Sequence, residues 1–177
     1  MTRSLASCAL AFALAGSLAR TEPAKTSLLE SPEPVIAALA RFAGARILNL
    51  DLRPDAFDVD VQDPAIPSHV DRFSFEEGVL GGPEPVQVGR NQKRLEAQLF
   101  PLADVDLAIL PRLLADAVER ARTEDGQVTH ARVERAEGYG EYDGWGRPVF
   151  RVYVDGPRGG AYVEYGLDGK KRDVKRW

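Results

Sequence analysis

Five aspartates lie close together in one short stretch of the sequence: Asp51, Asp55, Asp58, Asp60 and Asp63. A loop of converging carboxylates is the arrangement that binds a hard cation such as calcium. Here Asp58 and Asp60 alternate with apolar residues, so they project from one side of a predicted strand instead of converging. The glycine that a calcium loop needs at its turn is also missing. The spacing therefore favours a solvated strand face, with a calcium site as the alternative.

The two histidines, His69 and His130, do not have the spacing of a zinc site. His130 shares the parity of Arg132 and Glu134 on a predicted strand, and we expect it to be exposed. A shared zinc site would need the fold to bring the two histidines together. None of the serines beyond residue 20 lies in the G-x-S-x-G pattern of a serine hydrolase. We therefore predict no catalytic, cofactor-binding or metal-binding residues.

Aromatic side chains in the C-terminal half form the best candidate for a binding surface. Aromatic residues and arginine are enriched among the residues that dominate binding energy at protein interfaces. Tyr153 and Tyr162 take the polar parity of two adjacent predicted strands. The alternative is that the aromatic rings of the predicted loop at residues 137–147 fold back over the sheet. The candidate partner-binding residues are Tyr139, Tyr142, Trp145, Arg151, Tyr153, Tyr162 and Glu164.

The first 19 residues have the organisation of a cleavable secretory signal peptide. Arg3 gives a positive start, an uncharged apolar run follows from Leu5 to Leu18, and Ser17 and Ala19 are small residues at positions −3 and −1. We predict cleavage after Ala19 and a periplasmic or secreted location. The run is shorter than the ~20 apolar residues of a membrane-spanning helix, so we expect no transmembrane segment after cleavage. A retained N-terminal helix is the alternative.

Cys8 is the only cysteine of the chain. The segment Leu5-Ala6-Ser7-Cys8 is similar to a lipobox, in which the cysteine becomes the acylated first residue. Most of the apolar run comes after Cys8, and this order does not favour a lipoprotein. Cleavage after Ala19 would leave a chain without disulfides or thiolate chemistry. The net charge of −4 disfavours non-specific binding to nucleic acid.

The remaining sequence repeats one order of elements. Residues 20–30 are polar and predict a flexible leader. Residues 31–77 predict a helix and three strands, residues 78–94 a linker rich in glycine and proline, and residues 95–177 a second helix with three strands. Residues 95–99 suggest a short strand before that helix. The fold class is therefore α+β, with two helix-then-antiparallel-meander (αβββ) units. Each helix packs on one face of a sheet, and the units have separate sheets or share one.

One stretch carries a family resemblance. The helix contains Leu113-Leu114-Ala115-Asp116-Ala117, the next strand is Val149–Val154, and Tyr162-Val163-Glu164-Tyr165 with Asp168-Gly169 follows. With these residues, the segment 107–177 resembles the PepSY-like and β-lactamase-inhibitor-protein-like modules of exported bacterial proteins. Residues 33–77 look like a looser copy, in tandem. The resemblance implies an exported binding or inhibitory module without catalytic residues.

Together these patterns predict an exported, non-enzymatic binding module. Its expected partner is another protein of the envelope or outside the cell, which it would inhibit or modulate. Two alternatives remain from the sequence. One is a small periplasmic hydrolase or metal-dependent enzyme with scattered site residues, and the other is a structural or assembly factor of the cell envelope.

Overall fold

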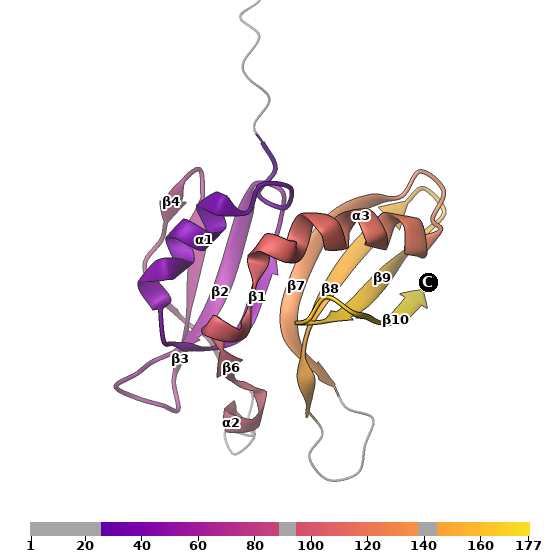
Figure 1. The fold of residues 1–177 in the computed structure, drawn as a ribbon. Coiled ribbons are helices and arrows are strands. Elements are labelled where there is room, and N and C mark those ends of the chain that lie inside the picture. Colours follow the sequence, from indigo (N-terminus) through magenta and orange to yellow (C-terminus); the bar gives the residue numbers. More distant parts are fainter. Residues whose placement is uncertain (1–25, 89–94, 138–144) are drawn as a thin grey trace, which may run out of the picture.

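A computed structural model describes residues 26–88, 95–137 and 145–177. Its strands form one ten-stranded sheet in which neighbouring strands run antiparallel (Figure 1). In spatial order, eight of them are β10 (Lys171–Arg176), β9 (Gly159–Gly166), β8 (Trp145–Gly156), β7 (Gln127–Glu137), β1 (Arg46–Leu52), β2 (Ala56–Gln62), β3 (Val70–Glu76) and β4 (Val79–Leu80). Two short strands lie off this path: β5 (Glu84–Pro85) pairs with β3, and β6 (Phe100–Pro101) pairs with β1.

The two halves of the chain meet where β1 pairs with β7. Residues 49–52 of β1 lie opposite residues 131–134 of β7. The α+β class and the large antiparallel sheet are confirmed, and the strands belong to one shared sheet. The finer division into two αβββ units stays a prediction, because further short elements lie between β3 and β7.

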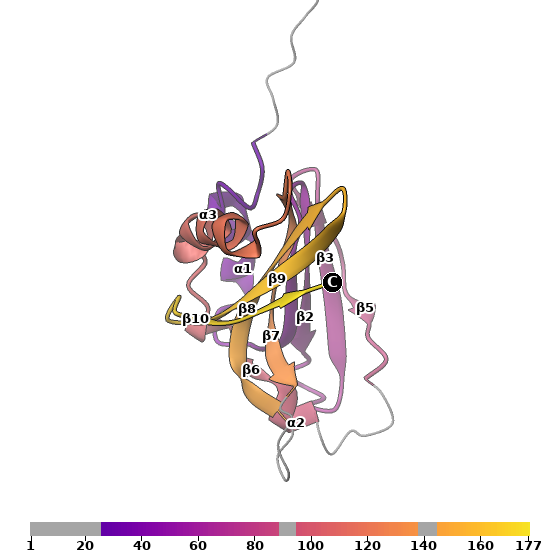
Figure 2. The ribbon, with the colours of Figure 1, turned by 90° about the vertical axis from the view of Figure 1, so that its right-hand side faces the viewer.

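Two main helices cover one side of this sheet (Figure 2). They are α1 (Glu33–Leu39), continued by the 3-10 turn η1 (Ala40–Phe42), and α3 (Leu110–Ala121), which follows the 3-10 turns η3 (Leu102–Asp104) and η4 (Leu107–Ile109). The helix α3 forms because its apolar residues recur at helical spacing, and five of them are buried: Leu110, Leu113, Leu114, Ala117 and Ala121. Asp106 caps η4 by accepting the Ala108 N–H, and Arg122 ends α3 in the left-handed conformation.

The core lies between these helices and the sheet. Alternate residues of each long strand point toward the helices, since side chains alternate between the faces of a sheet. Fully buried examples are Leu50, Leu52, Phe57, Val59, Ala131, Val133, Phe150, Val152, Val154, Ala161 and Val163. The Tyr165 hydroxyl donates to Asp116 Oδ2 at 2.8 Å, which fastens β9 to α3. Burial raises the pKa of Tyr165, and the bond to Asp116 raises it further.

The flexible leader predicted for residues 20–30 is wrong at its C-terminal end. Leu28 and Leu29 are only 9% and 2% exposed and belong to the main core. The Leu28 N–H donates to the Pro54 carbonyl at 2.7 Å, which holds this segment against the turn after β1. Two buried apolar side chains and this backbone bond therefore hold residues 28 and 29 against the fold.

The linker and the short strand also differ from expectation. Within the predicted linker of residues 78–94, β4 and β5 both pair with β3, so this part belongs to the sheet. Residues 95–99 do not form a strand, because α2 (Leu95–Gln98) is helical. One helical turn places Leu95 and Leu99 together, and both are buried against Val70 in a small second cluster.

The shared sheet predicts cooperative unfolding. Leu50 is fully buried and lies between Val59 of β2 and Val133 of β7. We expect Leu50→Ala to lower the free energy of unfolding by about 2–5 kcal/mol, through the cavity it leaves. Urea denaturation followed by far-UV circular dichroism and by tryptophan fluorescence should give one coincident transition. The control Val79→Ala, at a position 68% exposed, should change stability by less than about 0.5 kcal/mol. Two separate transitions, of which only one shifts, would contradict the shared core.

Candidate functional site

The side of the sheet that faces away from α1 and α3 carries the predicted site (Figure 2). We call it the open face and define it by the outward side chains of β1–β3 and β7–β9. On β8, Arg151 and Tyr153 point to this face because Phe150, Val152 and Val154 point into the core. The same alternation on β9 places Tyr162 and Glu164 beside them, opposite Tyr153 and Arg151.

Four rings form a line across the open face, which we call the aromatic row: His130, Tyr153, Tyr162 and Trp177. The His130 and Tyr153 rings stack with centroids 4.0 Å apart and planes 13° apart. The Tyr153–Tyr162 and Tyr162–Trp177 centroid distances are 5.6 and 6.3 Å. Such spacings suit tilted and offset contacts between aromatic rings. The row therefore joins β7, β8, β9 and the residue after β10 into one surface.

A second line, the charged row, runs beside the aromatic row. Arg151 lies between two carboxylates, with Nη1 donating to Glu134 Oε1 at 2.5 Å and Nε donating to Glu164 Oε2 at 3.2 Å. Its guanidinium also lies 5.1 Å from the Tyr162 ring centroid. Burial opposes the charge of Arg151, but the two glutamates outweigh it and the pKa of Arg151 rises above its usual value. The arginine thus ties the charged row to the aromatic row.

The aspartates continue the charged row across β1 and β2. Arg132 Nε donates to Asp51 Oδ2 at 2.9 Å, which crosses the junction of β7 and β1. Asp60 accepts two bonds from Arg72, at 2.7 and 2.9 Å. The solvated face predicted for the aspartate series is wrong for Asp60, which is 3% exposed. No group of three or more metal-ligating side chains occurs within the described ranges.

Asp58 shows how these carboxylates are held. Burial alone would raise the pKa of Asp58, but hydrogen bonds from Ser74 and Arg53 outweigh it, and the pKa is lowered. The Arg53 Nη1 donates to Asp58 Oδ2 at 3.0 Å. Each of these aspartates is therefore engaged by an arginine or a hydroxyl, and the pairing stabilises the sheet.

A polar pocket of about 290 Å³ lies within the charged row. Asn49, Asp60, Glu134 and Arg151 line it, together with Gln98 from α2. The Asn49 Oδ1 atom is buried and has no hydrogen-bond partner among the described residues. A buried acceptor of this kind is normally satisfied, so the pocket suits water or a donor group from a bound molecule.

Four of the seven residues predicted for partner binding meet on the open face: Arg151, Tyr153, Tyr162 and Glu164. Tyr139 and Tyr142 lie outside the described residues. Trp145 is the first residue of β8 and pairs with Glu137, but the structure describes only its backbone. The role of all seven in binding stays a prediction.

Sequence reasoning missed three residues of this surface. His130 is half-buried against Tyr153 instead of exposed, and Glu134 and Trp177 complete the two rows. Strand parity contained the signal for His130 and Glu134, since they alternate with the buried Ala131 and Val133. No periodic signal was available for Trp177, which follows the last strand.

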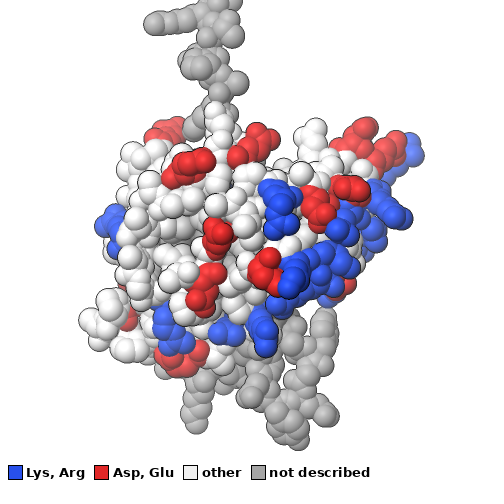
Figure 3. Space-filling model, in the orientation of Figure 1, with Lys and Arg blue, Asp and Glu red and all other residues white. Residues whose placement is uncertain are grey.

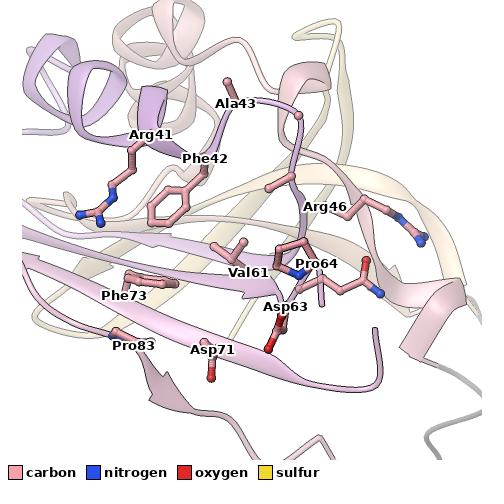
Figure 4. A pocket seen from close by; sticks show the side chains of 13 residues that line it. Arg41, Phe42, Ala43, Arg46, Val61, Asp63, Pro64, Asp71, Phe73 and Pro83 are labelled. Atoms are coloured by element: carbon pink, nitrogen blue, oxygen red, sulfur yellow. The ribbon is translucent and has the colours of Figure 1, made fainter. Parts of the chain in front are cut away.

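Another cavity, of about 600 Å³, lies on the helix-covered side (Figure 4). The rings of Phe42 and Phe73 have centroids 4.7 Å apart, and Val61 also lines the cavity. The Arg41 guanidinium lies over both rings, at 5.6 and 6.0 Å from their centroids. Because Val61 and Phe73 have the core-facing parity, this cavity is separated from the aromatic row by the sheet.

Comparisons with known proteins found a similar fold among solved structures but no matching family. No protein-family model and no curated protein matches the sequence. Among solved structures, the fold is similar to that of a putative lipoprotein from Clostridium difficile 630, with a TM-score of 0.53. The sequence identity is 12%, and the alignment covers 89% of this chain and 97% of that one. None of the helices in the described ranges has the length and apolar character needed to cross a membrane.

The position of Arg151 predicts a loss of stability when it is replaced. Its side chain is 18% exposed and separates Glu134 from Glu164. We expect Arg151→Met to lower the free energy of unfolding by about 3 kcal/mol, because two partly buried carboxylates lose their shared cation. Arg151→Lys, which keeps the charge but not the two-sided geometry, should cost about 1 kcal/mol. Urea denaturation measures both. Wild-type stability in Arg151→Met would rule out this role.

His130 predicts a pH dependence. Burial lowers the pKa of His130, and Arg132 lowers it further against the opposing effect of Asp51. The unfolded chain therefore takes up this proton first, and stability falls as the pH drops through about 6.5 toward the folded pKa. The urea midpoint should fall less between about pH 7.5 and about pH 5.5 in His130→Gln than in wild type or in the control His69→Gln. Equal falls in all three proteins would contradict the assignment.

Proposed function

We propose that this chain is an exported, non-enzymatic binding module that recognises another protein through the open face. The observation that carries the proposal is the aromatic row lying beside Arg151, which is held between Glu134 and Glu164. Tyrosine, tryptophan and arginine are the residue types that dominate binding energy at protein interfaces. Here they form one connected surface on rigid strands.

The ordering of this surface favours association. Side chains that are already held by cross-strand contacts lose less conformational freedom when a partner binds. Tyr153 and Tyr162 contact rings on both of their flanks, and Arg151 has both flanking glutamates. These side chains have therefore already lost much of their conformational entropy during folding, and less is lost on binding. This supports the open face as the recognition surface.

The charges of the open face also define its partner. Arg151, Arg132 and Arg72 are each paired with a carboxylate of the same face. Paired charges do not require compensating charges from the partner, so a largely neutral, aromatic and polar partner surface fits best. Binding through this face should depend only weakly on salt, because salt chiefly screens unpaired exposed charges.

We further propose that the protein is exported and that it inhibits or modulates its partner. The signal-like residues 1–19 support export, and the resemblance of residues 107–177 to PepSY-like and β-lactamase-inhibitor-protein-like modules supports inhibition or modulation of the partner. The interpretation as two αβββ units in tandem is compatible with the pairing of β1 with β7 at the centre of the sheet. The fold likeness to the Clostridium difficile protein is compatible with an envelope location.

The arrangement around His130 does not form the nucleophile–base pair that a hydrolase of the serine or threonine type would need. The Thr129 hydroxyl donates to Asp155 Oδ2 at 3.1 Å and lies 3.1 Å from His130 Nδ1. Because its one proton is given to Asp155, the hydroxyl can only accept from His130. A nucleophile–base pair needs the opposite direction, with the hydroxyl donating to the imidazole.

Site-dependent capture from an envelope extract tests the proposal. The bait begins at Arg20, which retains all described residues, and carries its tag at the N-terminus. We expect Tyr153→Ala with Tyr162→Ala to reduce capture of a specific partner at least ~30-fold, the loss typical of one strong interface residue. Circular dichroism and urea denaturation would confirm that each bait is folded.

The matched control replaces Ile36 and Val118 with alanine, since both are apolar, exposed by 44% and 41%, and lie on the helices. Its capture should equal that of wild type. A third bait, Tyr142→Ala with Trp145→Ala, tests Tyr142, which lies outside the described residues, and Trp145, of which only the backbone is described. A partner kept by the Tyr153 and Tyr162 variant but lost by the helix-side control would reject the open face.

A further inference from the structure

We propose that the edge of the sheet formed by β10 docks on an anionic lipid surface, with Trp177 entering the interfacial layer. This contact centres on the edge of the sheet, whereas partner recognition uses the open face, and Trp177 belongs to both. Lys171 and Arg172 lie outside the aromatic row, so vesicle binding by their variants and partner capture by the Tyr153 and Tyr162 variant test the two proposals separately.

The first observation is the concentration of positive charge along this edge. Residues 170–176 contain five basic side chains and one acidic side chain, Asp173, although the whole chain has a net charge of −4. The five are Lys170, Lys171, Arg172, Lys175 and Arg176. Figure 3 shows Lys and Arg side chains over the region of α3 and β10, with Asp and Glu side chains among them. Clusters of this size are typical of proteins that bind anionic lipid headgroups.

The second observation is how these side chains are held. Arg176 donates from Nε to the Ala121 carbonyl at 2.9 Å and from Nη2 to the Arg120 carbonyl at 2.8 Å, which fixes β10 against the end of α3. Lys171 and Arg172 are exposed, and none of the ion pairs within the described ranges includes either of them. The edge is thus a fixed backbone on which basic side chains outnumber the nearby carboxylates: Asp168 interacts with Lys170 and Arg172, and Lys171 and Arg172 remain exposed.

The third observation is Trp177. Its main chain pairs with Gly160, and its side chain is 62% exposed directly after Arg176. Tryptophan prefers the boundary between lipid headgroups and acyl chains, and its combination with lysine and arginine is typical of interfacial anchors. An exposed tryptophan at the end of a basic strand therefore points to a membrane surface more than to a soluble polyanion.

A simpler function of such lysines is to protect a sheet edge from pairing with another chain. That function accounts for Lys171 and Lys175. It does not account for Arg112, which belongs to a helix and whose Nη2 lies close above the Gly169 turn. It also does not account for the exposed indole of Trp177. An anionic lipid surface would attract the exposed cations Lys171 and Arg172 and accept the exposed indole of Trp177.

Vesicle co-sedimentation of the chain beginning at Arg20 tests the proposal. We expect binding to phosphatidylcholine vesicles that contain about one third phosphatidylglycerol, loss of binding at high salt, and no binding to phosphatidylcholine alone. Lys171→Glu with Arg172→Glu should weaken binding more than ~30-fold, since each cation near the surface contributes to attraction. The control Arg41→Glu with Arg147→Glu makes the same change in net charge at exposed positions away from β10, and it should weaken binding less than ~3-fold.

Fluorescence locates the tryptophan. In a Trp145→Phe background, Trp177 is the only tryptophan, and acyl chains brominated near the headgroup should quench its emission on binding. Equal binding to both kinds of vesicle, equal losses in the two charge-reversal variants, or absence of quenching would overturn the proposal. Binding to soluble inorganic polyphosphate without binding to vesicles would overturn it as well.

Discussion

The pairing of residues 49–52 in β1 with residues 131–134 in β7 turns two stretches of strands into one sheet, and both faces depend on it. On the helix-covered side, Leu50 and Val133 meet within a core that extends from Val35 of α1 to Tyr165 of β9. On the open side, Arg132 reaches Asp51 across the same junction. Without this ladder, each half would be near the size at which a small core is only marginally stable.

The sheet also carries two kinds of electrostatic surface. On the open face, arginines and carboxylates from neighbouring strands are paired with one another, so the face is ordered and locally neutral. At the β10 edge, basic residues outnumber acidic ones, and Lys171 and Arg172 form no ion pair within the described part of the chain. A neutral aromatic face and a cationic edge suit different partners, and Trp177 belongs to both.

Strand alternation made part of this structure predictable. The period of two placed Arg151, Tyr153, Tyr162 and Glu164 on one face, and the structure brings these four together. The helix α3 was predictable from its apolar spacing. The α2 segment was not, because Leu95 and Leu99 fit both an alternating strand and one helical turn. The burial of Asp60 depends on Arg72 in the next strand, and the order of Leu28 and Leu29 depends on Pro54. Such contacts between separate segments leave no local pattern.

Site-specific photocrosslinking in living cells can show whether a protein partner contacts the aromatic row. The photoreactive residue benzoylphenylalanine would replace Tyr162 on the open face in one version of the full chain and Val118 on α3 in another. We expect this contact to give a crosslinked partner from position 162 and none from position 118. A partner crosslinked only from position 118 would place recognition on the helices and contradict it.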